Sequence, residues 1–414
     1  MKRRRVVVTG IGAVTPIGHS AQGLWAGVRE NRCGIRTIDR FPTDDIRTTV
    51  AAQVDDFDPL DYFDAKLVRR MDRFAQMAVA GCDMAVKDAD LELDPSHPNP
   101  RIGVTMGTAL GGVAGAEREH EKYLQEGIRG VNTNLALVVF GGSGSSNIAI
   151  RFGLSGPSNA NSNSCSSGSI AIGEAYRYIR HGYADAMIAA SAEAPLYKLT
   201  FSAFTLIRTM SVNPDPQTAC RPFDRHRDGF VMGELSAVLV LEELGHALRR
   251  NARIYSEILG YACNNDAHHM VAPRADGVSA ARAITDAIED AGRSPSEIEY
   301  INAHASATQL NDRVETGVLK RVFGARASQI PISGTKAMHG HALGASGALE
   351  AAICCLVLQH DYLPPTLQLS TPDPDCDLDY IPNTGRHKRV DTILSNAFGF
   401  GGINATLVIG RYES

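Results

Sequence analysis

The chain has 414 residues, of which 44% are hydrophobic and 21% are charged, with a formal net charge of −5 at pH 7. This composition is ordinary for a globular protein with a large core. The net negative charge gives no electrostatic reason to expect nucleic-acid binding. Neither a secretory signal nor a run of about twenty apolar residues is evident. We therefore expect a cytoplasmic protein that does not span a membrane.

The eight cysteines include no C-x-x-C pair, which argues against a zinc ribbon or a thioredoxin-like redox site. Without a secretory signal, we expect these thiols to be reduced. Cys354 and Cys355 lie in an apolar run that predicts a buried helix.

The first part of the chain begins with an apolar strand at Val6–Val8 and a glycine-containing turn. The turn lacks the G-x-G-x-x-G spacing of dinucleotide-binding folds, because Val14, Thr15 and Pro16 separate Gly12 from Gly18. The pattern that follows predicts helices at 20–30 and 69–90 and strands at 101–108, 184–193 and 238–242.

A second series of elements begins near residue 254. It consists of strands at 299–303, 330–333, 391–396 and 405–409, with helices at 279–292, 312–324 and 343–358. Strands that alternate with helices predict an α/β fold whose mostly parallel sheets are covered by helices. The two consecutive series indicate a duplicated core, with one half at 1–250 and the other at 251–414.

Cys165 lies in a run of small polar residues just before a helical pattern marked by Ile172, Tyr176 and Ile179. This places a thiol at a helix N-terminus, where unpaired N–H groups and the helix dipole favour a thiolate. Small neighbours leave the sulfur accessible. The position fits a nucleophile, although free cysteines are also often buried structural residues.

Two windows contain histidines next to small residues. His304 directly follows the predicted strand at 299–303, and His339 and His341 lie on a glycine-rich turn that enters a helix. Ligands bind at strand ends in α/β sheets, so these histidines are candidate site residues. Metal binding by His339 and His341, with His304 or the His268–His269 pair, is an alternative that no typical ligand spacing supports.

A thiol and two imidazoles are suited to acyl transfer through a thioester. The thiolate attacks an acyl group, and neutral imidazoles donate hydrogen bonds to a developing oxyanion or move a proton. The turn Phe398–Gly402 adds backbone N–H groups on a segment able to move, as an oxyanion hole beside a gate requires.

These residues carry a resemblance to a known family. Over essentially its whole length the chain resembles β-ketoacyl-[acyl-carrier-protein] synthases, closest to the synthase II type. The landmarks are Val8–Gly12, Pro16–Gly18, the Cys165 turn followed by Ala171–Gly173, Arg221–Asp224, Arg227–Phe230, Gly233–Glu234, Asn302–His304, Lys336–Met338, Gly340–His341, Pro372–Asp373, Cys376–Asp379, Ser395–Asn396 and Phe398–Gly402. Each motif alone is weakly specific, but their order and spacing together are highly specific.

The resemblance implies a thiolase-like fold, with two similar halves in a layered αβαβα arrangement. It further implies that Cys165 accepts an acyl chain from acyl carrier protein, and that His304 and His341 promote decarboxylation of the malonyl extender. The N–H groups of Cys165 and Phe400 are then expected to stabilise the oxyanion, and Phe398 to act as a gate residue.

The remaining site residues are also assigned by the resemblance. Lys336 and Glu350 match a pair that orders the site, with Asp312 and Glu315 in the surrounding network. Ser306 and Thr308 match positions that bind the phosphopantetheine arm, and Leu110 and Phe204 match the acyl tunnel. The residues of a possible structural Na⁺ or K⁺ site are Asn302, Glu350, Ser395 and Asn396.

The resemblance implies no required cofactor and no catalytic metal. Substrates are carried on the phosphopantetheine of acyl carrier protein, and the expected assembly is a homodimer, with a heterodimer with a related ketosynthase-like subunit as the alternative. Two other functions stay open: a chain-length-determining partner subunit and a thiol-dependent acyl hydrolase or transferase. The presence of Cys165, His304 and His341 argues against a partner subunit without chemistry. The second histidine and Lys336 argue against a hydrolase or transferase, which would not need them.

The chain departs from the family pattern next to the cysteine, where Ser166 and Ser167 replace the usual Ala-Thr or Thr-Ser. His339 stands where threonine is common, and we expect it to be a surface turn residue. The segment Thr205–Ile207 is bulkier than expected near the tunnel. These departures indicate a specialised acyl substrate, such as a polyketide, a polyene or a modified fatty acid.

Overall fold

The computed structural model describes residues 4–413. Its main feature is a continuous mixed sheet of two half-sheets that meet along one seam. The first half-sheet contains β1 (Val6–Thr15), β5 (Ile102–Gly107), β6 (Ser158–Asn161), β7 (Ala186–Glu193) and β8 (Leu235–Glu243). The second contains β9 (Ser256–Asn265), β10 (Tyr300–Asn302), β11 (Ile332–Ser333), β14 (Thr392–Gly399) and β15 (Ile403–Gly410).

The two half-sheets repeat one topology. The strands run in the order β6-β5-β7-β8-β1 in the first and β11-β10-β14-β15-β9 in the second. If the five strands of each half are numbered along the chain, both orders are 3-2-4-5-1. The halves join where Val6, Val7 and Val8 of β1 pair with Ile258, Glu257 and Ser256 of β9. The predicted duplicated thiolase-like α/β fold is therefore confirmed.

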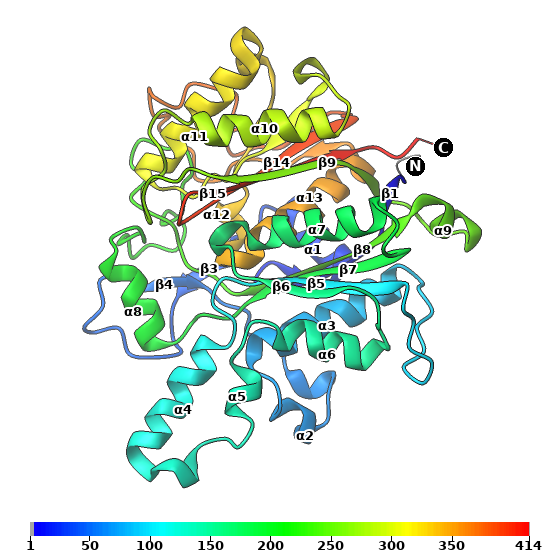
Figure 1. Ribbon diagram of the computed structural model, residues 1–414. Helices are drawn as coiled ribbons and strands as arrows, with labels where there is room; N and C mark the ends of the chain where they lie inside the picture. Colours follow the sequence, from blue (N-terminus) through cyan, green and yellow to red (C-terminus); the bar gives the residue numbers. More distant parts are fainter. Residues whose placement is uncertain (1–3, 414) are drawn as a thin grey trace.

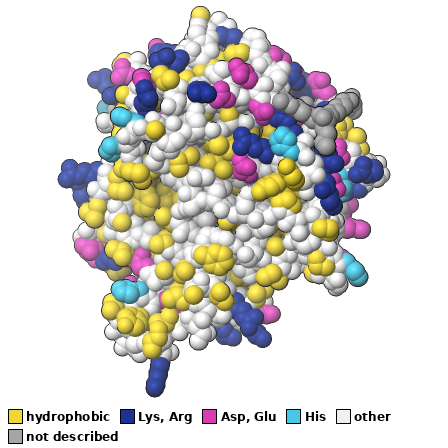
Figure 2. All heavy atoms as spheres, viewed as in Figure 1, with side chains coloured by type: hydrophobic (Ala, Val, Ile, Leu, Met, Phe, Trp, Pro, Cys, Tyr) yellow, Lys and Arg dark blue, Asp and Glu magenta, His cyan; other side chains and the backbone are white. Residues whose placement is uncertain are grey.

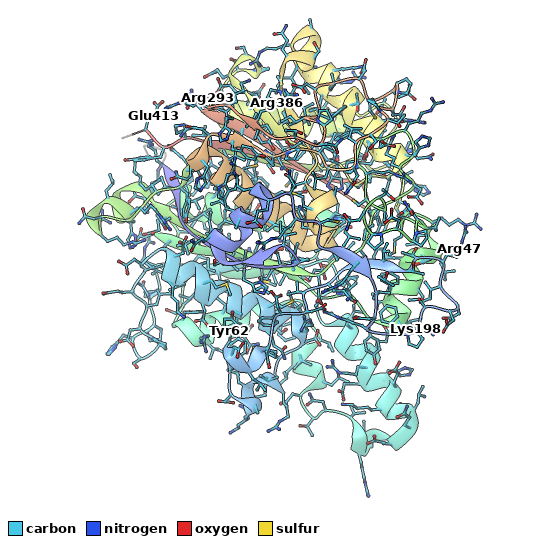
Figure 3. The ribbon with its side chains drawn as sticks, turned by 180° about the vertical axis from the view of Figure 1, so that it is seen from behind. Arg47, Tyr62, Lys198, Arg293, Arg386 and Glu413 are labelled. Atoms are coloured by element: carbon cyan, nitrogen blue, oxygen red, sulfur yellow. The ribbon has the colours of Figure 1, made fainter. Side chains whose placement is uncertain are left out.

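Helices cover the outer faces of both half-sheets and fill the space between the half-sheets (Figure 1). One outer layer holds α10 (Val278–Asp290) and α11 (Gln309–Phe323), and the opposite one holds α3 (Arg73–Asp88) and α6 (Ser143–Phe152). The central layer contains α1 (Ser20–Arg29), α7 (Ser167–Arg180), α12 (Lys336–His339) and α13 (Ser346–His360). Seen from behind, the labelled Arg293 and Arg386 lie over the half with β9–β15, and Tyr62 lies on the other (Figure 3).

The remaining helices and strands lie around this layered body. The helices are α2 (Ala65–Val68), α4 (Val113–Glu126), α5 (Leu135–Val138), α8 (Lys198–Leu206) and α9 (Leu244–Arg249). The strands are β2 (Gly18–His19), β3 (Ile35–Thr37), β4 (Val50–Ala52), β12 (Tyr362–Leu363) and β13 (Arg386–His387). The α4–α5 region projects from the body, and apolar side chains gather on it (Figures 1 and 2).

The expectation of mostly parallel sheets is wrong. Parallel pairing occurs where β5 contacts β6 and β7, and where β10 contacts β11 and β14. The pairs around the seam, which are β7–β8, β8–β1, β1–β9, β9–β15 and β15–β14, are antiparallel. The short turn between β14 and β15 makes a hairpin, which only antiparallel strands allow.

The predicted buried helix at 343–358 is confirmed. The stretch Leu343–His360 is long and apolar enough to cross a membrane by length and composition, and 89% of it is buried inside the protein. Its residues contact the half-sheets from the central layer, so its apolar character is explained by core packing.

Candidate active site

Cys165 lies at the junction between the first half-sheet and the central layer. It occupies the 3-10 turn Ser164–Ser166, immediately before α7, as the sequence predicts. Ser164 adopts a left-handed backbone conformation with φ of 52°, which reverses the chain after β6. The Ser167 hydroxyl closes the turn by accepting from the Asn163 N–H at 2.8 Å and donating to the Ser164 carbonyl at 2.7 Å.

The electrostatic surroundings of the thiol differ from the sequence-based expectation. Cys165 is only 5% exposed, and burial raises the pKa of its thiol. The Ser164 hydroxyl, the Lys336 ammonium and the Phe400 backbone N–H oppose that effect, while Glu193 adds to it. The helix N-terminus therefore does not by itself make Cys165 a ready thiolate, because desolvation outweighs it.

His341 is the side chain nearest to the thiol with acid–base capacity. Its Nε2 lies 3.0 Å from Cys165 Sγ, and its Nδ1 lies 2.9 Å from the Ser346 hydroxyl at the start of α13. When Ser346 donates to Nδ1, the Nε2 atom carries the ring proton and donates to the sulfur. That tautomer stabilises a thiolate at Cys165.

His304 follows β10 and faces His341, with the two ring centroids 5.5 Å apart and the planes nearly perpendicular. Glu315 fixes the backbone here by accepting from the N–H groups of His304 and Ala305 at 2.8 and 2.9 Å. Burial, and then the Lys336 ammonium, hold the pKa of both imidazoles well below the usual range. Both rings are therefore neutral at physiological pH and available as hydrogen-bond donors.

Lys336 and Glu350 form a buried ion pair at the base of the site. The Lys336 Nζ lies 2.5 Å from Glu350 Oε1 and also donates to the His304 carbonyl, and both side chains are fully buried. Burial raises the pKa of Glu350 to about 7, and Lys336 works against that rise. Asp312 lies in the same network, where it accepts from the Phe223 N–H at 2.9 Å and approaches Arg227.

A cavity of about 150 Å³ brings the predicted residues together. Its lining includes Cys165, His304, His341, Ser306, Thr308, Phe398 and Phe400. The hydroxyls of Ser306 and Thr308 lie 3.0 Å apart at its wall. These hydroxyls therefore lie in the same cavity as the Cys165 sulfur.

Leu110 and Phe204 do not line this cavity. They pack against an apolar cluster that contains Phe201 and Met210 and that shares Cys165, Phe230 and Leu343 with the cavity wall. The cluster lies around the sulfur and continues from the cavity, so it offers the apolar surroundings that an acyl chain requires.

The residues of the possible monovalent-cation site lie where β10 and β14 run side by side, with Asn302 opposite Ser395. Three oxygens there are buried without a hydrogen-bond partner: Asn302 Oδ1, Glu350 Oε2 and Ser395 Oγ. Unsatisfied buried oxygens are costly unless a donor or a cation meets them. Asn396 is satisfied, because its Oδ1 accepts from Thr406. The donor set therefore fits a hard monovalent cation.

His339 is not the surface residue that we expected. It is fully buried in α12, where its Nε2 lies 3.1 Å from the Thr335 hydroxyl and its Nδ1 has no partner. Burial, and then Lys336, lower its pKa to about 3. The glycine-rich pattern indicated an exposed turn, but the turn is folded into the central layer between the halves.

Clustered metal ligands are absent from the described residues 4–413: no group of three or more His, Cys, Asp or Glu side chains has a geometry that holds a metal ion. His269, one of the alternative ligands, uses its Nδ1 to accept from the N–H groups of Val271 and Ala272 at 3.0 and 3.1 Å. It therefore shapes the loop at the cavity wall.

The sequence analysis missed Glu193 and Ser346. Glu193 ends β7 and is fully buried, and its carboxylate accepts from the N–H groups of Ala109, Leu110 and Gly344. Burial raises its pKa to about 7. The sequence offered one signal for Glu193, which is a carboxylate at the end of an otherwise apolar strand. Ser346 gave none, because its spacing from His341 follows no known motif.

A buried thiol beside two neutral imidazoles, on a duplicated thiolase-like fold, defines an enzyme of the class that carries acyl groups as thioesters. Comparison with known families narrows the class. Residues 3–247 match the N-terminal domain of β-ketoacyl synthase, and residues 255–370 match the C-terminal domain. The chain belongs to the β-ketoacyl synthase family.

Individual relatives agree with this assignment. The chain is 43% identical to a 3-oxoacyl-[acyl-carrier-protein] synthase 2 from Synechocystis over 100% of this chain and 99% of the relative. It is 39% identical to the enzyme of the same name from Coxiella burnetii over 99% of each.

Solved structures give the same result. A type II polyketide ketosynthase, in complex with its acyl-carrier protein and bound to a hexaketide, matches with a TM-score of 0.92 and 36% identity over 99% of this chain and 100% of that one. The ishigamide ketosynthase/chain length factor matches with a TM-score of 0.93 and 34% identity over the same shares.

Proposed function

We propose that the protein is a β-ketoacyl-[acyl-carrier-protein] synthase that joins an acyl primer to a malonyl extender with loss of carbon dioxide. The observation that carries this proposal is the position of the Cys165 sulfur 3.0 Å from His341, with His304 facing His341 in the same cavity. Acyl chemistry at the thiol and charge stabilisation at the two imidazoles are then available in one place.

In the first half-reaction, the Cys165 sulfur attacks the thioester carbonyl of the primer on acyl carrier protein. The new carbon–sulfur bond replaces the bond to the phosphopantetheine sulfur. The proton lost from Cys165 leaves with the phosphopantetheine thiol, so charge is balanced. Ser306 and Thr308 hold the phosphopantetheine arm, and the primer chain lies in the apolar cluster beside Leu110 and Phe204.

In the second half-reaction, the malonyl carbon–carbon bond breaks and carbon dioxide leaves. The electron pair moves into an enolate whose oxygen accepts hydrogen bonds from His304 and His341. The enolate carbon attacks the acyl carbonyl on Cys165, and the N–H groups of Cys165 and Phe400 stabilise the oxyanion. Collapse of the oxyanion expels the Cys165 thiolate and releases the 3-ketoacyl product.

Burial and then Lys336 keep both imidazoles neutral in this scheme, and Glu350 neutralises the lysine. Glu315 holds the backbone at His304, Asp312 holds the N–H of Phe223 in the surrounding network, and Phe398 acts as the gate. We also propose a structural Na⁺ or K⁺ held by Asn302, Glu350, Ser395 and Asn396, with no part in the bond-making steps. Exchange of Na⁺ and K⁺ for a large organic cation tests it through the melting temperature.

We propose acyl carrier protein as the partner and the cytoplasm as the location. We further propose a homodimer built on the edge strand β6 and the apolar α4–α5 projection, where Leu124, Ile128 and Leu137 are exposed. A heterodimer with a related ketosynthase-like subunit is the alternative assembly. The division into halves at 1–250 and 251–414 stays a prediction.

The decisive experiment incubates the purified protein with acyl- and malonyl-acyl carrier protein. We expect 3-ketoacyl product and carbon dioxide in equal amounts. If the malonyl group is never consumed while Cys165 becomes acylated, the protein is a thiol-dependent acyltransferase. If Cys165 is never acylated, the protein is a partner subunit that shapes a tunnel.

A further inference from the structure

Ser166 is the residue next to the nucleophile at which this chain departs from the family pattern. Its side chain is fully buried, although the catalytic cavity lies beside it. Its hydroxyl does not point into that cavity. It lies instead against the β14–β15 hairpin, which carries the turn Phe398–Gly402.

The Ser166 hydroxyl contacts both strands of this hairpin next to its turn. Its Oγ lies 3.0 Å from the carbonyl oxygen of Ala397, on β14, and 2.8 Å from that of Ile403, the first residue of β15. A hydroxyl has one hydrogen, so it donates to one carbonyl at a time or shares the hydrogen between both. One side chain thus holds both strands at the point where the turn begins and ends.

The turn itself lies directly on the nucleophile turn. A Cβ atom placed on Gly399 would lie 3.1 Å from the Cys165 nitrogen and 3.2 Å from Ser166 Oγ. Such distances are shorter than about nine in ten real Cβ contacts, so a side chain at this position would have to push the two turns apart by a few tenths of an ångström. The next residue, Phe400, lines the cavity beside Cys165, and its backbone N–H lowers the pKa of the thiol.

These contacts connect Ser166 to the sulfur through the gate turn. The position of the Phe400 N–H depends on how the β14–β15 hairpin packs against the Cys165 turn. Ser166 supplies a side-chain hydrogen bond between the two, at the ends of the strands next to the hairpin turn. Because the surroundings are dry, a hydrogen bond there is stronger than one in water.

We propose that Ser166 is a positioning residue that fastens the gate hairpin to the nucleophile turn, so that the Phe400 N–H is held on the Cys165 sulfur. This role rests on the proposed function, since it assigns the gate and the oxyanion donor to that reaction. Ser166 touches no substrate in this role and acts only through Phe400.

The chain offers a matched control three residues further on. Ser169 lies in the first turn of α7 and is also fully buried, but its hydroxyl has no hydrogen-bond partner. Ser166→Ala and Ser169→Ala therefore both remove one buried hydroxyl near the start of α7, and only the first removes a link to the hairpin.

The first measurement is the pH dependence of Cys165 alkylation by iodoacetamide, followed by peptide mass spectrometry so that other cysteines do not contribute. Loss of the Phe400 N–H from the sulfur destabilises the thiolate, so we expect the Ser166→Ala profile to move to higher pH. Ser169→Ala should follow the wild type. Ser166→Thr keeps the hydroxyl and should also follow it.

The second measurement is steady-state condensation. Ser166→Ala should lower kcat by about five- to tenfold, the effect of one hydrogen bond, and change KM by less than about twofold. Gly399→Ala adds a methyl group between the hairpin turn and the Cys165 turn, which should push the two turns apart. It should therefore move the alkylation profile to higher pH, as Ser166→Ala does. It keeps the proposal testable if Ser166→Ala does not fold.

An unchanged alkylation profile in both Ser166→Ala and Gly399→Ala overturns the positioning role. An equal shift in Ser169→Ala also overturns it, because the effect would then come from general loosening of α7. Alkylation needs no carrier protein, so this result is independent of the condensing activity. A protein that shows the profile shift but makes no 3-ketoacyl product would refute the proposed function alone.

Discussion

The two halves of the molecule contribute to the site in different ways. The first half presents Cys165 among apolar residues and neutral hydroxyls, with no ion pair at the sulfur. The second half presents His304 above the buried pair of Lys336 and Glu350. Burial and then one fixed cation keep both imidazoles uncharged. The thiol is stabilised as a thiolate by the Ser164 hydroxyl, by Lys336 and by the Phe400 N–H, and it lies against His341.

The largest expected effect tests the first half alone. Cys165→Ala removes the nucleophile, so no acyl-enzyme should form and condensation should fall by more than about 1,000-fold. Mass spectrometry after incubation with acyl-acyl carrier protein checks this result. An acyl adduct on another residue would contradict the assignment. Cys165→Gln should still decarboxylate malonyl-acyl carrier protein, because the second half stays intact.

The next prediction separates the two half-reactions. His341→Ala should lower condensation by about 100- to 1,000-fold, the effect of losing a donor to the enolate oxygen. Acyl loading onto Cys165 should fall less, because the Ser164 hydroxyl, Lys336 and the Phe400 N–H still stabilise the thiolate. Rapid-quench measurement of both rates checks the difference. Equal losses would mean that the halves do not divide the chemistry as proposed.

The ion pair of the second half is tested by stability as well as activity. Lys336→Met leaves the Glu350 carboxylate buried without a partner, so unfolding should become easier by about 3–5 kcal/mol. The double variant Lys336→Met with Glu350→Leu should regain most of that stability in chemical denaturation. It should not regain condensation. Full recovery of activity would show that the charge itself has no function.

The smallest effect concerns His339. Its folded pKa of about 3 lies below the unfolded value, so only the unfolded state gains a proton as the pH falls below about 6.5. Stability associated with neutral His339 is present at pH 8 and is lost with acid. The wild type should therefore lose about 2 kcal/mol more than His339→Thr between pH 8 and pH 5. Equal losses in denaturant titrations would contradict the shift.

Much of the fold was predictable because helix and strand periods are local properties of the sequence. Predicted helices at 20–30 and 69–90 and strands at 101–108 and 184–193 correspond to α1, α3, β5 and β7. Strand direction was not predictable in this way, since periodicity carries no information on direction. The five-residue turn at 398–402 was the missed signal for an antiparallel pair.

The site shows the same division between local and long-range information. The sequence indicated Cys165, His304 and His341 because each follows a strand or precedes a helix in a run of small residues. Burial of the thiol and of the turn that carries His339 depends on contacts between residues far apart in sequence, such as Cys165 with His341 and Gly34 with Met338. Local patterns do not record such contacts, so the charge state of the thiol could not be inferred.

The seam at Val6–Val8 has a consequence for how the protein is made. The first strand pairs with β8 and β9, whose residues lie more than 200 positions later in the chain. At about 5–20 residues per second of synthesis, β1 waits roughly 10–50 seconds before its neighbours exist. During that time an apolar strand edge is open to wrong pairing. The nascent chain, more than the finished enzyme, is therefore the form most exposed to aggregation.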